Sequence, residues 1–245
     1  VEYLLNTPYT AADDVGAVII EAQQGEGGYL APNPEFFQRL KASCEKHGAL
    51  FIVDEVQSGA GRSGKMWAIE HSDVEPDMLT FGKGMGGDVP MAGLSMRKDL
   101  ARKIADNSQP NTFAANGVSA AVCMANIDII TENDFALVDR VAKLGELTIK
   151  RLKKGAKHIE CIGDVRGRGF MIGIELVKDR KTKEPFDQDL MGQVIMGMMA
   201  KGVILVPCGR NGNVLRFMPP LTIPKKYLDK ASDLLLEVLS TIKIK

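Results

Sequence analysis

The stretch Ala49-Leu50-Phe51-Ile52-Val53 is an apolar run that stops at Asp54. A short apolar run bounded by polar residues and glycine predicts a buried strand. Upstream of it, residues 34–47 begin with a proline, carry apolar residues at helical spacing and stop at a glycine, which predicts a helix. Another apolar run, residues 17–20, precedes that helix. Strand, helix and strand in this order predict a βαβ unit, and therefore an α/β fold with a mainly parallel sheet.

The remaining chain is expected to complete this sheet domain and to form a second domain. Residues 78–81 and 91–96 read as two further strands, and residues 117–130 as a helix that leads out of the sheet. We place the first domain at residues 1–130 and a smaller α+β domain at residues 131–245. The elements expected in the second domain are helices at 135–153, 188–201 and 225–242 and strands at 170–176 and 203–206.

Composition excludes several classes of function. The 31 basic and 31 acidic residues balance, so we expect neither a nucleic-acid surface nor attraction to an anionic membrane. No apolar run approaches the roughly 18 residues of a membrane span, and the start of the chain carries no secretion signal. The four cysteines and three histidines are scattered. This pattern predicts reduced, partly buried thiols in a cytoplasmic protein and no metal site.

Two charged residues lie where ligands of α/β proteins bind. Asp54 ends one predicted strand and Lys83 follows another, and such sheets bind ligands beyond the carboxyl ends of their strands. A lysine and an aspartate in this place are what a pyridoxal phosphate (PLP) enzyme needs. The lysine forms a Schiff base with the cofactor aldehyde, and the aspartate keeps the pyridine nitrogen protonated. The alternative is an exposed loop lysine among glycines and a solvated strand end at Asp54 and Glu55.

Three other features of the sequence resemble ligand-binding sites. Residues 59–65 (GAGRSGK) fit the phosphate-binding pattern G-x-x-x-x-G-K, but Met66 replaces the required Ser or Thr and no predicted strand leads in. Residues 167–169 (GRG) begin like a dinucleotide fingerprint, yet no predicted strand precedes them, so a tight turn into the next strand is expected. Arg216 lies between Leu215 and Phe217, where burial is costly unless the side chain meets an anion. It is therefore a candidate clamp for a carboxylate.

Taken together, several strings resemble class III (omega) PLP-dependent aminotransferases, most of all 4-aminobutyrate (GABA) aminotransferases. The strings occur in the family's order along the whole chain: residues 21–28 (EAQQGEGG), 54–64 (DEVQSGAGRSG), 81–84 (FGKG), 111–113 (NTF), 163–169 (GDVRGRG), 213–216 (NVLR) and 219–221 (PPL). The resemblance implies PLP fold type I, with a partial large domain and a small C-terminal domain. It also implies a homodimer or a higher homo-oligomer.

The resemblance implies roles for five residues around the cofactor. Lys83 would form the Schiff base and then move a proton between the substrate Cα and the cofactor C4′. Asp54 would pair with the pyridinium nitrogen, Val56 would pack on the ring, and Gln57 would bond the phenolic oxygen. Thr112 would reach the phosphate of the cofactor in the partner subunit.

Two further residues would bind substrate by the same resemblance. Arg216 would hold a substrate carboxylate, and Glu26 would pair with Arg216 when the substrate has no carboxylate there. The implied reaction is transamination between an amino donor, such as GABA or another omega-amino acid, and an α-keto acid such as 2-oxoglutarate or pyruvate. The residues do not name the donor.

Alternative functions remain open from the sequence. Residues 161–185 also resemble dialkylglycine decarboxylase, although the acid at Glu26 favours transamination. An amino-acid epimerase on the same scaffold is a further possibility. Chains of the family are much longer, so we expect this chain to be a C-terminal part that binds PLP weakly by itself. A catalytically incomplete fragment is therefore the alternative from a non-enzyme class.

Overall fold

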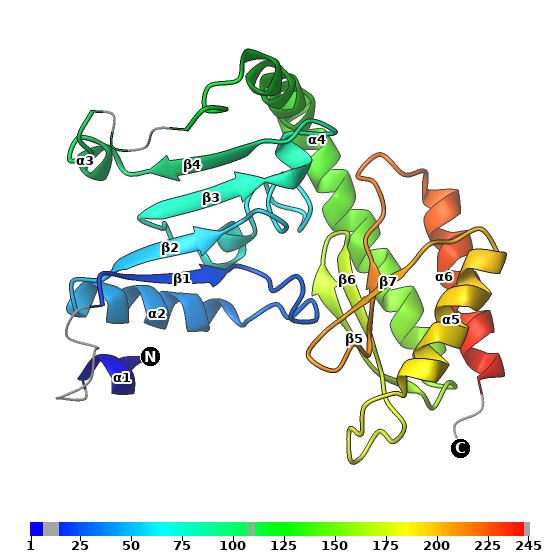
Figure 1. The fold of residues 1–245 in the computed structure, drawn as a ribbon. Coiled ribbons are helices and arrows are strands. Elements are labelled where there is room, and N and C mark those ends of the chain that lie inside the picture. Colours follow the sequence, from blue (N-terminus) through cyan, green and yellow to red (C-terminus); the bar gives the residue numbers. More distant parts are fainter. Residues whose placement is uncertain (7–14, 107, 109–110, 243–245) are drawn as a thin grey trace. The chain divides into compact units, whose positions relative to one another are not determined.

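The computed structural model describes residues 1–6, 15–106, 108 and 111–242, and the chain forms two compact units (Figure 1). Unit 1 comprises Val1–Ala22, Pro32–Ala60 and Lys65–Asp134. Unit 2 comprises Gln23–Ala31, Gly61–Gly64 and Phe135–Lys245. Two short segments of the first half of the chain therefore belong to the second unit. The division at residue 130 stays a prediction.

Unit 1 is built on a four-stranded sheet in the order β1-β2-β3-β4. Strands β1 (Ala17–Glu21), β2 (Leu50–Asp54) and β3 (Met78–Gly82) are parallel, and β4 (Ala92–Met96) pairs antiparallel with β3. The predicted α/β class and the mainly parallel sheet are confirmed. The helix between β1 and β2 is α2 (Pro34–Lys46), which begins after Asn33, and the Asn33 side chain accepts a hydrogen bond from the Glu35 amide. Such a cap satisfies one of the free amides of a helix start.

The core of unit 1 lies between α2 and the sheet. Phe37, Leu40 and Cys44 form the buried face of α2, and they pack with Phe51 and Val53 of β2. The shorter elements of this unit are α1 (Glu2–Asn6), η2 (Ala68–Ser72), η3 (Lys83–Met85) and α3 (Lys98–Ala101). The alternating burial of β2 follows from its pleat, which sends successive side chains to opposite faces.

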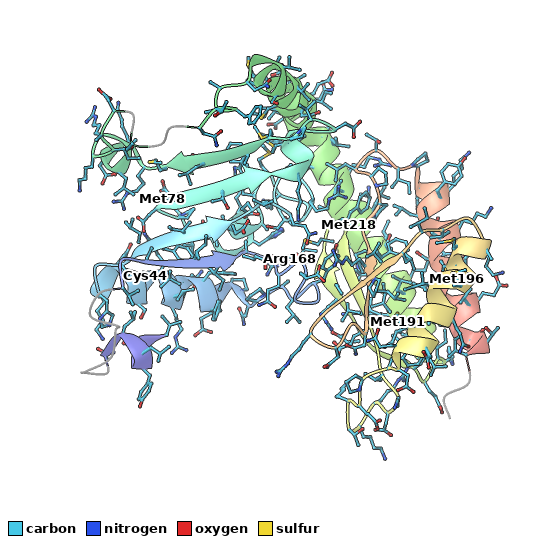
Figure 2. All side chains as sticks on the ribbon, viewed as in Figure 1. Cys44, Met78, Arg168, Met191, Met196 and Met218 are labelled. Atoms are coloured by element: carbon cyan, nitrogen blue, oxygen red, sulfur yellow. The ribbon has the colours of Figure 1, made fainter. Side chains whose placement is uncertain are left out.

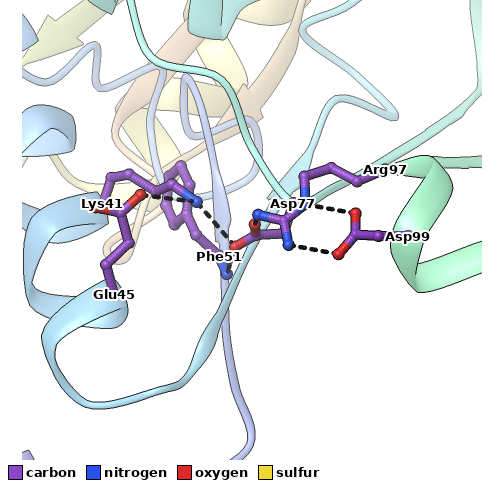
Figure 3. A network of polar contacts seen from close by, with 6 residues as sticks. All are labelled: Lys41, Glu45, Phe51, Asp77, Arg97 and Asp99. Atoms are coloured by element: carbon purple, nitrogen blue, oxygen red, sulfur yellow. Dashed lines mark hydrogen bonds and ion pairs between the residues drawn. The ribbon is translucent and has the colours of Figure 1, made fainter.

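A buried carboxylate ties three elements of unit 1 together at the start of β3 (Figure 3). The Asp77 carboxylate accepts hydrogen bonds from the Phe51 amide at 2.7 Å, the Lys41 ammonium at 3.0 Å and the Arg97 guanidinium at 2.6 Å. Burial alone would raise the pKa of Asp77, but these donors outweigh it and hold the pKa below its ordinary value. The network therefore fixes α2, β2 and the end of β4 relative to one another.

Helix α4 (Gly117–Ala156) runs from unit 1 into unit 2. The sequence predicts two helices here, at 117–130 and 135–153, and that separation is wrong. The polar residues 131–134 (TEND) interrupt the apolar pattern without ending the helix. The backbone takes positive φ at Asn133, Asp134 and Phe135, where the division between the units falls.

Unit 2 holds a four-stranded antiparallel sheet in the order β5-β6-β8-β7. Its elements are β5 (Ile162–Arg168), β6 (Met171–Leu176), α5 (Gln188–Ala200), β7 (Val206–Cys208), β8 (Val214–Phe217) and α6 (Lys225–Thr241). Helices α5 and α6 lie side by side, and their apolar faces complete the core (Figure 1). On α5, Met191 is buried in this core, whereas Met196 is exposed (Figure 2).

Three expectations for unit 2 need correction. The strand expected at 203–206 is β7, which begins only at Val206. Strands β5 and β8 were not predicted, because β5 (IGDVRGR) carries glycines and charges and β8 (VLRF) has only four residues. Of residues 167–169, Gly167 and Arg168 belong to β5, and the tight turn into β6 lies at Gly169 and Phe170, so the expectation that no strand precedes the turn is wrong. All four cysteines are buried and free. Within the described part of the chain no helix combines the length and apolarity of a membrane span.

Candidate functional site

Asp54 and Lys83 lie at the carboxyl ends of two neighbouring parallel strands of unit 1. Asp54 ends β2 and is aligned with Thr80 of β3, and Lys83 is the first residue after β3. The Asp54 carboxylate is half-buried, and its Oδ1 accepts a hydrogen bond from the Val56 amide at 2.9 Å. This bond holds the carboxylate at the strand end, where a cationic partner can reach it.

The backbone at Lys83 adopts an uncommon conformation. Its φ is +41°, a region that residues with a Cβ rarely occupy. The side chain is exposed, and the residue opens the short helix η3, in which the Lys83 carbonyl accepts a hydrogen bond from the Gly86 amide at 3.0 Å. Strained backbone of this kind clusters at functional sites, where it aims a side chain.

The side chains around this strand end fit the chemistry of PLP. Val56 and Gln57 follow Asp54 and are both half-buried. Asp54 supplies a carboxylate for a ring N–H, and Val56 supplies an apolar side chain for a ring face. Gln57 supplies an amide for a phenolic oxygen, and Lys83 supplies a primary amine for an aldehyde. All four belong to unit 1.

Thr112 comes from another part of unit 1. It lies exposed in the turn ahead of α4, where the Asn111 side chain accepts a hydrogen bond from the Phe113 amide at 2.9 Å. The same turn presents Phe113 with 82% of its surface exposed. The exposure of Thr112 suits a contact with another molecule better than a contact with the sheet of unit 1.

Glu55 differs from the solvated residue considered from the sequence. It is 1% exposed, its Oε1 accepts a hydrogen bond from the Ile69 amide at 2.8 Å, and its Oε2 accepts one from the Ser58 hydroxyl. Burial raises the pKa of this carboxyl, and the hydrogen bonds offset only part of that effect. Glu55 thus fastens the turn after Asp54 to the helix η2.

A second charged pair lies in unit 2. Arg216 is on β8 with 18% of its side chain exposed, and its Nη2 donates to the carboxylate of Glu26, whose side chain is 79% exposed. Arg216 Nε is buried and lacks a hydrogen-bond partner among the described residues. Burial alone would lower the pKa of Arg216, but Cys208 and Glu26 raise it above its ordinary value. A largely buried cation therefore faces a carboxylate that is mostly exposed to solvent.

Two residues beside this pair were not predicted as site residues from the sequence. Tyr29 is fully buried, its hydroxyl donates to the Met218 sulfur at 3.1 Å, and burial raises its pKa to about 12. Cys208 is buried in one cluster with Tyr29, and burial raises the pKa of its thiol. Both side chains lie close enough to Arg216 to raise its pKa. The available signals were the glycines ahead of Tyr29 and the pair Cys208-Gly209.

Comparisons with known proteins identify the family of the chain. The model of the family described as aminotransferase class-III matches residues 1–239. The chain belongs to the class-III aminotransferase family. A leucine/methionine racemase of Thermococcus litoralis is 40% identical over 95% of this chain and 51% of its own. A 4-aminobutyrate aminotransferase of Escherichia coli is 40% identical over 87% of this chain and 49% of its own.

A solved structure of an aminotransferase extends the likeness to the fold. A Bacillus anthracis aminotransferase superimposes with a TM-score of 0.87 and 31% identity, over 93% of this chain and 52% of its own. The predicted family and fold class are therefore confirmed. The chain spans about half the length of the curated relatives it matches.

Proposed function

We propose that this class-III chain carries the cofactor lysine and the substrate-carboxylate arginine of a PLP-dependent aminotransferase. The observation that carries the proposal is the placement of Asp54 and Lys83 at neighbouring strand ends. When bound, PLP supplies an electron sink for the negative charge that develops next to the reacting amine. Asp54 would hold the protonated ring nitrogen, and the Lys83 amine would accept the proton that leaves the substrate Cα.

The pair Glu26–Arg216 supports two kinds of substrate. The Glu26 side chain is 79% exposed, so a substrate carboxylate can take its place on Arg216 and keep the guanidinium paired. An α-keto acid such as 2-oxoglutarate then binds Arg216 directly through a carboxylate. An omega-amino acid such as 4-aminobutyrate leaves Glu26 in place, which neutralises the buried guanidinium. The likeness to a 4-aminobutyrate aminotransferase supports this donor class.

A racemase is the second candidate, because a leucine/methionine racemase is equally similar in sequence. That chemistry uses the same cofactor lysine but returns the proton to the same carbon, so no amine leaves.

We also propose that the protein is a homodimer or higher homo-oligomer in the cytoplasm. Phe113, Val118 and Met124 around the start of α4 are large apolar residues that stay exposed in the single chain. A second copy of the chain would cover this region if Thr112 reaches the cofactor phosphate held by that copy. The four free thiols are typical of a reducing compartment.

The reaction is tested by supplying the PLP-loaded protein with amines and keto acids. With 4-aminobutyrate or 5-aminovalerate and 2-oxoglutarate we expect glutamate to form. Arg216→Met should lower kcat/KM for 2-oxoglutarate by about 10–100-fold, because a charge-assisted pair is lost. Arg210→Met is the matched control, since Arg210 is exposed in the β7–β8 turn. Racemisation of leucine without amine transfer, or CO2 release from a dialkylated amino acid, would overturn the assignment.

A further inference from the structure

The motif at residues 163–169 has no role in the proposed chemistry, yet one of its residues reaches the loop of Glu26. Arg166 lies on β5 with 17% of its side chain exposed. Its Nε and Nη2 both donate to the Gly28 carbonyl, at 3.0 and 2.8 Å. Two donors on one carbonyl fix both the position and the direction of the peptide that follows Glu26 by two residues.

The other side of Arg166 is anchored in the sheet. Its Nη1 pairs with Glu175 on β6 and with Asp164 on β5, the latter at 3.2 Å. These two carboxylates hold the guanidinium so that its remaining nitrogens point at Gly28. Arg166 is thus a rigid bridge between the antiparallel sheet and residues 23–31, which are remote from it in sequence.

The loop fits closely where Arg166 holds it. A Cβ at Gly28 would lie 3.2 Å from Arg166 Nη2 and 3.4 Å from Gly209 Cα, and Gly28 has a φ of +112°. The Gly209 amide donates to the Glu26 carbonyl at 2.8 Å. Tyr29, the next residue, is buried with Cys208. Glu26 therefore has a backbone fixed from both sides and a side chain that remains free to leave Arg216.

We propose that Arg166 is a positioning residue that keeps Glu26 within reach of Arg216. The inference rests on the proposed function, because it assigns Arg166 to the choice between substrates with and without a carboxylate for Arg216. When the loop is released, Arg216 loses its internal partner. A substrate that needs a neutralised Arg216 then binds and reacts less well, while a substrate that brings its own carboxylate is unaffected.

The variant Arg166→Lys separates this role from general stability. Lysine keeps the positive charge for Glu175 and Asp164, but a single ammonium cannot place two donors on the Gly28 carbonyl. Arg180→Lys is the matched control. Arg180 also donates to backbone carbonyls of unit 2, those of Ala156, Ile159 and Glu160, which lie outside the loop.

The first readout is the alkylation rate of Cys208 in the native protein, followed by peptide mass spectrometry. Because Tyr29 of the docked loop packs against Cys208, Arg166→Lys should raise this rate about tenfold or more. Cys161, which is buried elsewhere in unit 2, is the internal reference and should stay protected. An unchanged Cys208 rate would overturn the proposed hold on the loop.

The second readout compares the two half-reactions in the PLP-loaded protein. Arg166→Lys should lower kcat/KM for 4-aminobutyrate about tenfold and leave that for 2-oxoglutarate within about threefold. Glu26→Gln should shift the ratio in the same direction. Equal losses in both half-reactions would reduce Arg166 to a structural role. If no amine transfer occurs with any donor, the proposed function and the selection role both fail, while the Cys208 rate still decides whether Arg166 holds the loop.

Discussion

Adjacent carboxylates at the end of β2 have opposite surroundings. Asp54 is half-buried and bonded to the Val56 amide, whereas Glu55 is buried and bonded to Ser58 and Ile69. The pleat of the strand sends neighbouring side chains to opposite faces. One acid can therefore serve a ligand while the next one serves the fold.

Burial of Glu55 predicts a pH dependence of stability. Its pKa in the folded state lies above the ordinary value of 4.5, so the folded state binds this proton more tightly than the unfolded state. Its contribution is most favourable below pH 4.5 and declines as the pH rises through 4.5 toward the folded-state pKa. Glu55→Gln removes that decline. In urea unfolding at pH 4 to 7, the variant should gain stability relative to the wild type as the pH rises. A difference that stays constant with pH would contradict the raised pKa.

Sequence patterns find some site residues and miss others for a physical reason. Asp54 and Lys83 were found because each follows an apolar run, and strand ends are recognisable in one dimension. Glu26 and Arg216 are 190 residues apart, so only family resemblance connected them. Arg166 could not be assigned a role, because it acts on the Gly28 carbonyl, and a backbone acceptor leaves no trace in a residue pattern.

The elements show a similar division between predictable and unpredictable parts. Helix α6 and strand β2 carry uninterrupted apolar patterns and lie close to the predicted bounds. Strand β5 owes its place to pairing with β6 along its length, and its buried residues, such as Ile162 and Val165, do not alternate regularly. Pairing between strands decides such an element, and the residues of the strand alone do not reveal it.

Close packing of α4 predicts opposite effects for two helical glycines of unit 2. A Cβ at Gly145 in α4 would lie 2.1 Å from the Gly169 carbonyl oxygen, whereas a Cβ at Gly192 in α5 meets no atom within 4 Å. Gly145→Ala should destabilise the protein by about 1–3 kcal/mol through overpacking. Gly192→Ala should stabilise it by about 0.5–1 kcal/mol, because alanine loses less backbone entropy in a helix. Chemical denaturation measures both. Stabilisation by both variants would refute the close approach of α4 to the β5–β6 turn.

At the scale of the whole molecule, the single chain leaves apolar surface uncovered around the start of α4. Sedimentation velocity at micromolar concentration should show at least a dimer of the wild-type chain. Met124→Glu should shift the population toward monomer, because a charge at a covered apolar position is costly. Leu147→Glu, at an exposed position further along the same helix, is the control and should leave the association unchanged. A wild-type chain that is monomeric throughout would refute the proposed assembly.

Reductive labelling shows directly whether Lys83 carries the cofactor. The protein is incubated with increasing PLP, reduced with borohydride, and mapped by peptide mass spectrometry for pyridoxyl groups on lysine. We expect Lys83 to be labelled at a lower PLP concentration than the exposed Lys98 of the same unit, and Asp54→Asn to weaken this preference. Labelling of Lys83 only at the PLP concentration that also labels Lys98 would show that Lys83 is not the cofactor lysine.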